Sequence, residues 1–179
     1  MRIVSVNVAR ASAIEIQGRR VLTAIGKRPV AGAVAVHRQV GLSKAVYAYP
    51  IEHYPFWQTV RAQAGVAAWD EVLPHGAMGE NLTIEGLLES QVWVGDLLRF
   101  PDCELLVSEP RYPCFKLNAA MGFNQAGKLM AANAWCGYYL AVRTGGTLTA
   151  GDSFELIPGP REVGIQELFR SRMARAKST

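Results

Sequence analysis

The segment EPRYPCFKL places one cysteine among residues that favour its ionised form. Pro110 and Pro113 constrain the backbone, and Pro113 also removes a hydrogen-bond donor next to the thiol. Arg111 and Lys116 bring positive charge near Cys114, and cations stabilise the thiolate, which is the nucleophilic and metal-binding form of cysteine. A helix that begins here would add the positive end of its dipole. The segment predicts a nucleophile or a metal ligand, although most free cysteines are small buried hydrophobic residues, as expected for the other two in this chain.

A second segment, HGAMGENLTIEG at residues 75–86, contains a loop of small residues between two glycines. Glu80 and Asn81 follow this loop and precede a predicted strand. Such a loop lets backbone N–H groups approach a ligand closely, but the same residues also make an ordinary polar turn. His75 is a candidate ligand or proton donor.

A third segment, SKAVYAYPIEHYPFW at residues 43–57, is crowded with aromatic rings. These rings either pack in the core or form a stacking surface for a flat heterocycle. Lys44 is a candidate anion contact. The sequence has no HExxH motif, no GxGxxG or Walker loop and no GxSxG elbow, which argues against the zinc, dinucleotide, triphosphate and serine enzymes that use them.

The elements that must position these groups are mostly short strands. Alternation near the N-terminus places Val4, Val6 and Val8 on one face of a first strand. Many short strands separated by Gly and Pro predict a β-barrel or a sandwich. The later predicted strands lie in AIEIQG, RVLTAIG, GAVAVH, KAVYAY, NLTIEG, QVWVGDLLRF, CELLVSEP, GYYLAVRTGG and DSFELIPG.

Three helical stretches interrupt the strands. Residues 55–65 and 114–121 each run into a glycine that would end a helix, and the second stretch resumes over 125–134. The third, residues 163–177, is amphipathic and is expected to pack on the strands, with contact to another subunit as the alternative. Its apolar stripe consists of Ile165, Leu168, Phe169 and Met173.

Length and composition set the class of protein. The chain has 179 residues, 50% of them apolar, which fits one domain with a sizeable core. The longest apolar runs are too short for a membrane span, and the alternating N-terminus is unlike a secretory signal. Three cysteines without a CxxC pair argue against a disulfide framework or a closed zinc site, and they favour a cytoplasmic location. A net charge of +4 gives no dense basic face for a nucleic-acid polymer.

Five segments also occur in an order that is typical of one family: GKRPVAGAVAV, KAVYAYPIEHYPFW, GENLTIEG, VGDLLRF and EPRYPCFKL. Together they resemble a MOSC domain, the module related to the C-terminal part of molybdenum cofactor sulfurases, and most of all its stand-alone YiiM-like subgroup. The resemblance implies a β-barrel with helical insertions over residues 1–160. Residues 161–179 would form a C-terminal helical tail.

This resemblance implies a protein associated with the molybdenum cofactor (molybdopterin), a pterin dithiolene that bears a phosphate. YiiM-like proteins are linked to the detoxification of N-hydroxylated bases such as 6-hydroxylaminopurine, which implies a cofactor-dependent oxidoreductase. The sequence shows no flavin or haem motif, so the electrons would come from a separate reductase. A homodimer is considered as the assembly.

The family cysteine corresponds to Cys114. Its thiolate is a soft ligand, suited to molybdenum that dithiolene sulfurs already hold. Arg111 and Lys116 would keep the thiol ionised and pair with cofactor oxygens. An aromatic wall for a flat base is expected near Tyr47 or Tyr112. The other cofactor contacts that the matched segments imply are Lys27, Lys44, Glu80 and Asn81.

Two departures from the family pattern leave alternatives open. Before Lys44 the chain reads VAVHRQVGLSK and is shorter than YiiM-like sequences, which carry a Gly-Asp loop and a His-Gly-Gly segment there. A true loss would remove polar groups from the cofactor pocket. The chain also ends after one short helix, where larger members continue. The alternatives are a sulfur carrier with a persulfide on Cys114 and a non-catalytic molybdopterin-binding module.

Overall fold

The structure, a computed structural model, describes residues 1–16, 18–38 and 42–176. It confirms a mainly β fold with helical insertions. The helices are η1 (Ile51–His53), α1 (Tyr54–Gln63), η2 (Glu89–Gln91), α2 (Phe115–Met121), α3 (Ala126–Asn133) and α4 (Ile165–Arg175), where η marks a 3₁₀ helix. The strands are β1 (Arg2–Val8), β2 (Ser12–Ile16), β3 (Arg19–Thr23), β4 (Arg28–Pro29), β5 (Val34–Val36), β6 (Val46–Pro50), β7 (Leu82–Glu85), β8 (Leu97–Arg99), β9 (Glu104–Pro110), β10 (Tyr138–Thr144), β11 (Gly146–Leu148) and β12 (Glu155–Ile157).

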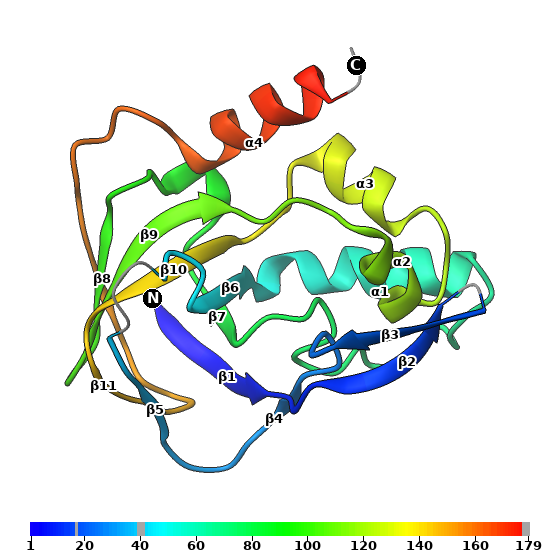
Figure 1. Ribbon diagram of the computed structural model, residues 1–179, viewed down its shortest axis with the longest axis horizontal. Coiled ribbons are helices and arrows are strands. Elements are labelled where there is room, and N and C mark those ends of the chain that lie inside the picture. The colour runs from blue at the N-terminus through cyan, green and yellow to red at the C-terminus, as the bar shows by residue number, and fades with distance from the viewer. Residues whose placement is uncertain (17, 39–41, 177–179) are drawn as a thin grey trace.

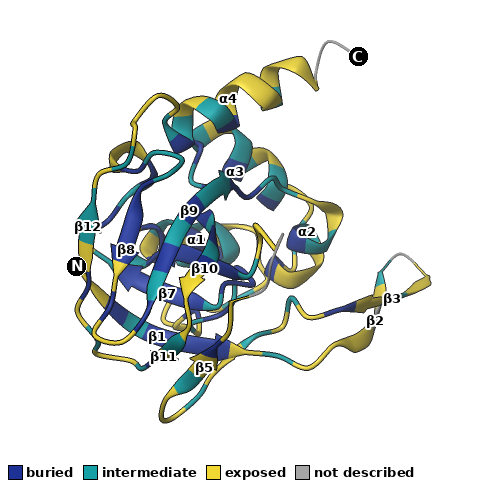
Figure 2. Cartoon of the chain, turned by 60° about the vertical axis from the view of Figure 1, so that its left-hand side comes forward, coloured by how far each residue is buried: buried dark blue, intermediate teal, exposed yellow. Residues whose placement is uncertain are grey.

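Eight of the described strands form one sheet in the order β12-β8-β9-β10-β6-β7-β1-β4 (Figure 1). β6 and β7 run parallel, with Ala48 opposite Leu82, whereas the other described neighbours in this sheet are antiparallel. Two ribbons, β2–β3 and β5–β11, complete the strands. In Figure 2 the β2–β3 ribbon projects from the rest of the fold, and most of it is exposed.

The sheet curls until its two ends approach each other. The N–H of Ile3 in β1 donates to the carbonyl of Asp152, just before β12, at 2.8 Å. The N–H of Gly151 donates to the carbonyl of Ile3, also at 2.8 Å. Over the described residues, however, the outermost strands β12 and β4 do not pair with each other, so the closed barrel stays a prediction.

The described α-helices begin and end within two residues of the predicted bounds. α1 carries a proline in its first turn, where a missing N–H is harmless, and the chain turns just after it at Gly65, whose φ is +70°. α2 ends at Gly122, which has a φ of +81° and donates its N–H to Ala119. α3 confirms the predicted resumption. No helix within the described ranges is long and apolar enough to cross a membrane.

The last helix, α4, packs against the sheet as predicted. Ile165 and Phe169 are fully buried and belong to the same hydrophobic core as Leu105 and Tyr138. The N–H of Ile165 donates to the carbonyl of Val92 at 2.9 Å, which fixes the start of the helix. α4 is therefore joined to the core by both side chains and backbone.

The first strand differs from the predicted pattern. Of its valine face, Val6 is buried but Val8 is 41% exposed. The opposite face is buried as well and carries Ser5 and Asn7, and the register with β7 shifts between Ile3 and Ser5. Buried polar groups need hydrogen-bond partners, so β1 brings a polar cluster into the interior.

Candidate functional site

Cys114 lies between β9 and α2 with its side chain exposed. Its backbone is extended (φ −133°, ψ 166°), and its carbonyl accepts the N–H of Leu117 at 2.9 Å, which starts α2. The other cysteines are buried, as predicted. Burial raises the pKa of both thiols, to about 11 for Cys103 and well above the ordinary value for Cys136. Of the three thiols, Cys114 is therefore the one that a ligand can reach.

Arg111 is a buried cation next to this cysteine. Its side chain is 7% exposed, and its guanidinium carbon lies 5.0 Å from the centre of the Tyr47 ring. Burial acts to lower the pKa of Arg111, but Tyr47, Tyr139 and Cys114 act to raise it, and the net shift is upward. Its Nη1 is buried without a hydrogen-bond partner among the described residues. Arg111 therefore keeps its charge and has a donor free for a ligand.

Lys27, Asn81 and Tyr47 meet at one point. The ammonium of Lys27 donates to the carbonyl of Gly79 and to Oδ1 of Asn81, both at 2.8 Å. The same Oδ1 accepts the backbone N–H of Tyr47 at 3.0 Å. Burial lowers the pKa of Lys27 to about 8; the Glu80 carboxylate opposes this shift, and the charge of Arg111 adds to it. Arg111 is thus close enough to Lys27 to influence its pKa.

Glu80 is fully buried and organises the loop before β7. Its Oε1 accepts hydrogen bonds from the phenol of Tyr54, from the N–H of Gly76 at 2.8 Å and from the hydroxyl of Thr83 at 2.8 Å. Burial, helped by this carboxylate, raises the pKa of Tyr54, so the phenol stays protonated. Oε2 of Glu80 has no partner in the described part of the chain. The role that this geometry shows for Glu80 is to position its neighbours.

The buried polar residues of β1 are linked to Glu80 through the hydroxyl group of Thr83. Asn7 donates through Nδ2 to the Thr83 hydroxyl at 3.0 Å and accepts the hydroxyl of Ser5 at 2.8 Å. Sequence analysis missed these residues. Their alternation with the valines of β1 places Ser5 and Asn7 on one face of the strand, but alternation alone does not show that this polar face is buried.

The loop before Glu80 closes tightly over Lys27. Gly76 has a φ of +88°, and a Cβ at this position would lie 2.6 Å from the carbonyl oxygen of Lys27. Gly79, with a φ of +81°, offers its carbonyl to the ammonium of the same lysine. The predicted small-residue loop thus packs closely against Lys27, contacting both its backbone and its ammonium group.

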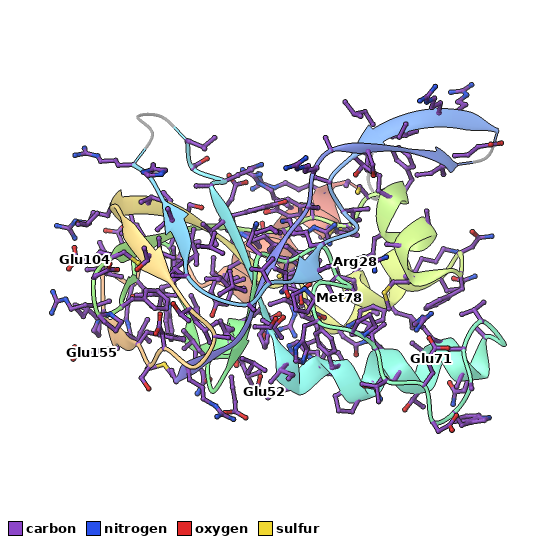
Figure 3. All side chains as sticks on the ribbon, turned by 90° about the horizontal axis from the view of Figure 1, so that it is seen from below. Arg28, Glu52, Glu71, Met78, Glu104 and Glu155 are labelled. Atoms are coloured by element: carbon purple, nitrogen blue, oxygen red, sulfur yellow. The ribbon has the colours of Figure 1, made fainter. Side chains whose placement is uncertain are left out.

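Residues of α2 line several cavities in the described part of the chain, and two of these cavities include predicted site residues other than aromatic ones. We call the first the cationic cavity: its volume is about 660 Å³, and its lining includes Lys27, Arg28, Arg61 and His75. Arg61 forms an ion pair with Glu71, with the two groups 2.9 Å apart. Arg28, on β4, and Glu71, in the loop after α1, are labelled in Figure 3.

The second, the Cys114 cavity, has a volume of about 610 Å³. It shares no lining residue with the cationic cavity. Its lining consists of Pro113, Cys114, Phe115, Asn118, Asn124, Gly127, Lys128, Ala131, Ala132 and Met173.

The two remaining predicted lysines are engaged elsewhere. Lys44 lies 3.1 Å from the Glu109 carboxylate and 5.5 Å from the centre of the Tyr139 ring. Lys116 donates to the backbone carbonyl of Leu22 at 3.4 Å, which links α2 to the β2–β3 ribbon. The shortened segment before Lys44 includes residues 39–41, which lie outside the described residues.

Tyr47 and Tyr112, near which an aromatic wall is expected, line neither of these two cavities. Tyr47 is 3% exposed and donates its hydroxyl to the carbonyl of Cys136 at 2.9 Å. Tyr112 stacks on Phe169, with ring centres 5.7 Å apart. The aromatic ring that lines the Cys114 cavity is Phe115, which is 56% exposed.

The site therefore combines an exposed thiol, a buried guanidinium with a free donor, and a lysine that titrates near neutral pH. Among the residues described there is no group of three or more His, Cys, Asp or Glu side chains that could hold a metal ion. The arrangement suits an anionic ligand that Cys114 can reach, and the thiol is available for covalent or metal-ligating chemistry.

Comparison with known proteins gives consistent matches. The family described as MOSC domain matches residues 35–155. YflK of Bacillus subtilis, an uncharacterized protein, is 32% identical over 184 residues, which covers 96% of this chain and 79% of YflK. Protein YiiM of Escherichia coli is 31% identical over 156 residues, which covers 86% of this chain and 66% of YiiM.

A longer fungal protein and a solved structure match as well. A protein named Reductase from Gibberella moniliformis is 31% identical over 137 residues, which covers 74% of this chain but 24% of that protein. The crystal structure of YiiM from Geobacillus stearothermophilus superimposes with a TM-score of 0.80 at 31% identity and covers 97% of this chain and 84% of that one.

Proposed function

Because this chain belongs to the MOSC domain family, as a YiiM-like member, we propose that it is a molybdenum cofactor-dependent reductase of N-hydroxylated compounds. The overall reaction converts R–NHOH, two electrons and two protons to R–NH₂ and water. The substrates are N-hydroxylated bases of the 6-hydroxylaminopurine type, and a separate reductase donates the electrons. The name of the Gibberella relative, Reductase, supports oxidoreductase chemistry.

The residues near Cys114 fit a large anionic cofactor. Within the described chain, Nη1 of Arg111 is a buried donor without a partner, and such a donor is stabilised when a ligand supplies an acceptor. Lys27 uses two of its three N–H groups on Gly79 and Asn81, so one remains for a phosphate or pterin oxygen. Arg28 and His75 add further donors in the cationic cavity.

The observation that carries the proposal is the exposed Cys114 thiol beside the buried Arg111 cation. The thiol is exposed, so a metal centre can reach it, and cysteine sulfur is a soft metal ligand. Cys114 would be the protein's ligand to molybdenum, while the cofactor brings the dithiolene sulfurs. When bound, the cofactor supplies the two-electron chemistry that reduces the N–O bond.

Lys27 contributes positive charge to the cationic cavity. Because its pKa is lowered to about 8, Lys27 is mostly protonated at pH 7 but releases its proton more readily than an ordinary lysine. It therefore attracts the anionic groups of the cofactor at neutral pH.

Metal content tests the proposal. The wild type, Cys114→Ser and Cys103→Ser would be produced in a host that makes the cofactor, and molybdenum per protein would be measured by mass spectrometry. We expect metal in the wild type and in Cys103→Ser, which makes the same change at a buried site, and a loss of most metal in Cys114→Ser. Loaded protein should reduce 6-hydroxylaminopurine with a chemical electron donor. Absence of molybdenum from both the wild type and Cys114→Ser contradicts the proposal.

The exposure of Cys114 also favours a second candidate, a sulfur carrier. The thiol would hold a persulfide that a partner desulfurase provides and an acceptor removes. Intact-mass measurement separates the two functions: a mass increase of one sulfur atom that a reductant removes, and that Cys114→Ser lacks, indicates carriage. A protein that binds the cofactor but reduces no N-hydroxylated substrate is a binding module.

A further inference from the structure

We propose that the Cys114 cavity binds the organic part of the substrate, a planar heteroaromatic ring that carries hydrogen-bond acceptors and no positive charge. This inference rests on the proposed function, because it gives the substrate of that reaction a place. The volume of about 610 Å³ lies in the range of small-molecule sites, and Cys114 is part of the wall. Figure 1 shows α3 between α2 and α4, the three helices that contribute to this cavity.

The walls suit a flat apolar ring. Phe115 is 56% exposed, and a ligand that stacks on it would remove this large aromatic surface from water. The side chains of Ala131 and Ala132 are small, so a planar ring can approach the surface of α3 closely. Met173, on α4, is a flexible side chain that adapts to ligands of different shape.

The polar groups of the cavity divide into one fixed residue and two free ones. Asn118 donates to the carbonyl of Asn124 at 3.0 Å and accepts the N–H of Gly127 at 2.8 Å, so it holds α2 and α3 together. By contrast, neither the ammonium of Lys128 nor the side-chain amide of Asn124 has a hydrogen-bond or ion-pair partner in the described chain. A free cation and a free amide favour a ligand with acceptor atoms, and Lys128 repels a cationic one.

The two cavities separate the two ligands of the reaction. Lys27, Arg28 and His75 line the cationic cavity, which suits the phosphate-bearing cofactor. The Cys114 cavity has mostly apolar walls and shares none of these residues. Arg111 is near Lys27, whose pKa its charge helps to lower, and near Cys114, which acts to raise the pKa of Arg111. Arg111 therefore lies between the residues proposed to hold the cofactor and the thiol in the wall of the Cys114 cavity.

Binding of an unreactive probe tests the inference. Adenine, which is planar and rich in acceptors, would be titrated into the protein as purified, and binding would be followed by calorimetry and by the amide NMR signal of Gly127. Ala132→Trp fills the cavity from an exposed position, and Ala64→Trp makes the same change at an exposed position that lines neither cavity. We expect Ala132→Trp to weaken adenine binding at least about tenfold, or about 1.4 kcal/mol, and Ala64→Trp to leave it unchanged.

Charge gives a second readout. Benzamidine, planar but cationic, should bind more weakly than adenine to the wild type, and Lys128→Glu should reverse this preference. Equal adenine affinity in the wild type and Ala132→Trp, or benzamidine binding as tight as adenine binding, overturns the inference. Molybdenum content is measured on the same samples. Loss of the proposed function appears as missing metal, whereas failure of this inference appears as unchanged probe binding.

Discussion

The ammonium group of Lys27 is held between two acceptors inside the protein, and burial there lowers its pKa to about 8. The sequence predicted Lys27 as a contact of the site but not its pKa, because the groups that set it are distant in the chain. Glu80 comes from the loop before β7, and Arg111 comes from the segment after β9. A lysine that titrates close to neutral pH makes anion binding sensitive to pH.

We therefore predict that anion affinity in the cationic cavity falls as pH rises through about 8, since the positive charge of Lys27 is lost above its pKa. Sulfate is the probe, because its own charge does not change in this range, and calorimetry gives the affinity. Lys27→Arg keeps a positive charge throughout, so its affinity should stay nearly constant over the same interval. A wild type whose sulfate affinity shows no such fall would refute this role.

At the scale of elements, the loop before β7 depends on its glycines. Gly76 has a φ of +88°, and an added Cβ would lie 2.6 Å from the Lys27 carbonyl oxygen. Gly65, after α1, has a φ of +70° but nothing within 4 Å of an added Cβ. At both positions a residue with a side chain would be strained by the positive φ, but only at Gly76 would its Cβ also clash with a neighbouring atom.

Gly65→Ala should therefore cost about 1–2 kcal/mol of unfolding free energy, the strain of a left-handed residue. Gly76→Ala should cost about 1–3 kcal/mol more, because the clash forces the loop away from Lys27. Urea denaturation measures both values. Gly76→Ala should also weaken sulfate binding in the cationic cavity. Equal destabilisation by the two variants would show that the contact with Lys27 relaxes without cost.

Short-range signals predicted most of the elements. The helix stops at Gly65 and Gly122 are local, and the alternation of the strands is local too. The buried partnership of Asn7 with Thr83 joins residues that are 76 positions apart, and a single sequence contains no local signal for such a pair. The same holds for the order of the strands, in which β1 pairs with β7. Cys114 could be singled out from sequence because its prolines and cations are its neighbours in the chain, and its role as a ligand stays a prediction.

At the scale of the whole molecule, α4 connects the C-terminal segment to the site. The sequence predicted a helical tail over residues 161–179 that packs on the strands, and α4 shares the core of the sheet through Phe169. The Phe169 ring also stacks on Tyr112, with an interplanar angle of 7°. Tyr112 lies two residues before Cys114, so the core contact of α4 is close to the segment that holds the thiol.

We predict that Phe169→Ala lowers the free energy of unfolding by about 3–5 kcal/mol, the usual cost of removing a buried phenylalanine ring. Phe115→Ala removes the same ring from a side chain that is 56% exposed and should cost under about 1 kcal/mol. Thermal or urea unfolding of the two variants gives the comparison. A small effect of Phe169→Ala would mean that α4 contributes little to the core.

The parallel pairing of β6 with β7 bears on the order in which the protein folds. Parallel neighbours cannot be joined by a tight turn, so residues 51–81 must cross the sheet before the pair can form. This crossover carries α1, His75, Gly76 and Glu80, whereas β8 and β9 pair through a short connection. Closing the longer loop has a larger entropic barrier, so during refolding we expect amide protection in β8 and β9 to precede protection in β7. The lysine-binding loop would then be among the last parts of the molecule to mature, and a folding intermediate would have much of its sheet before it can hold an anion.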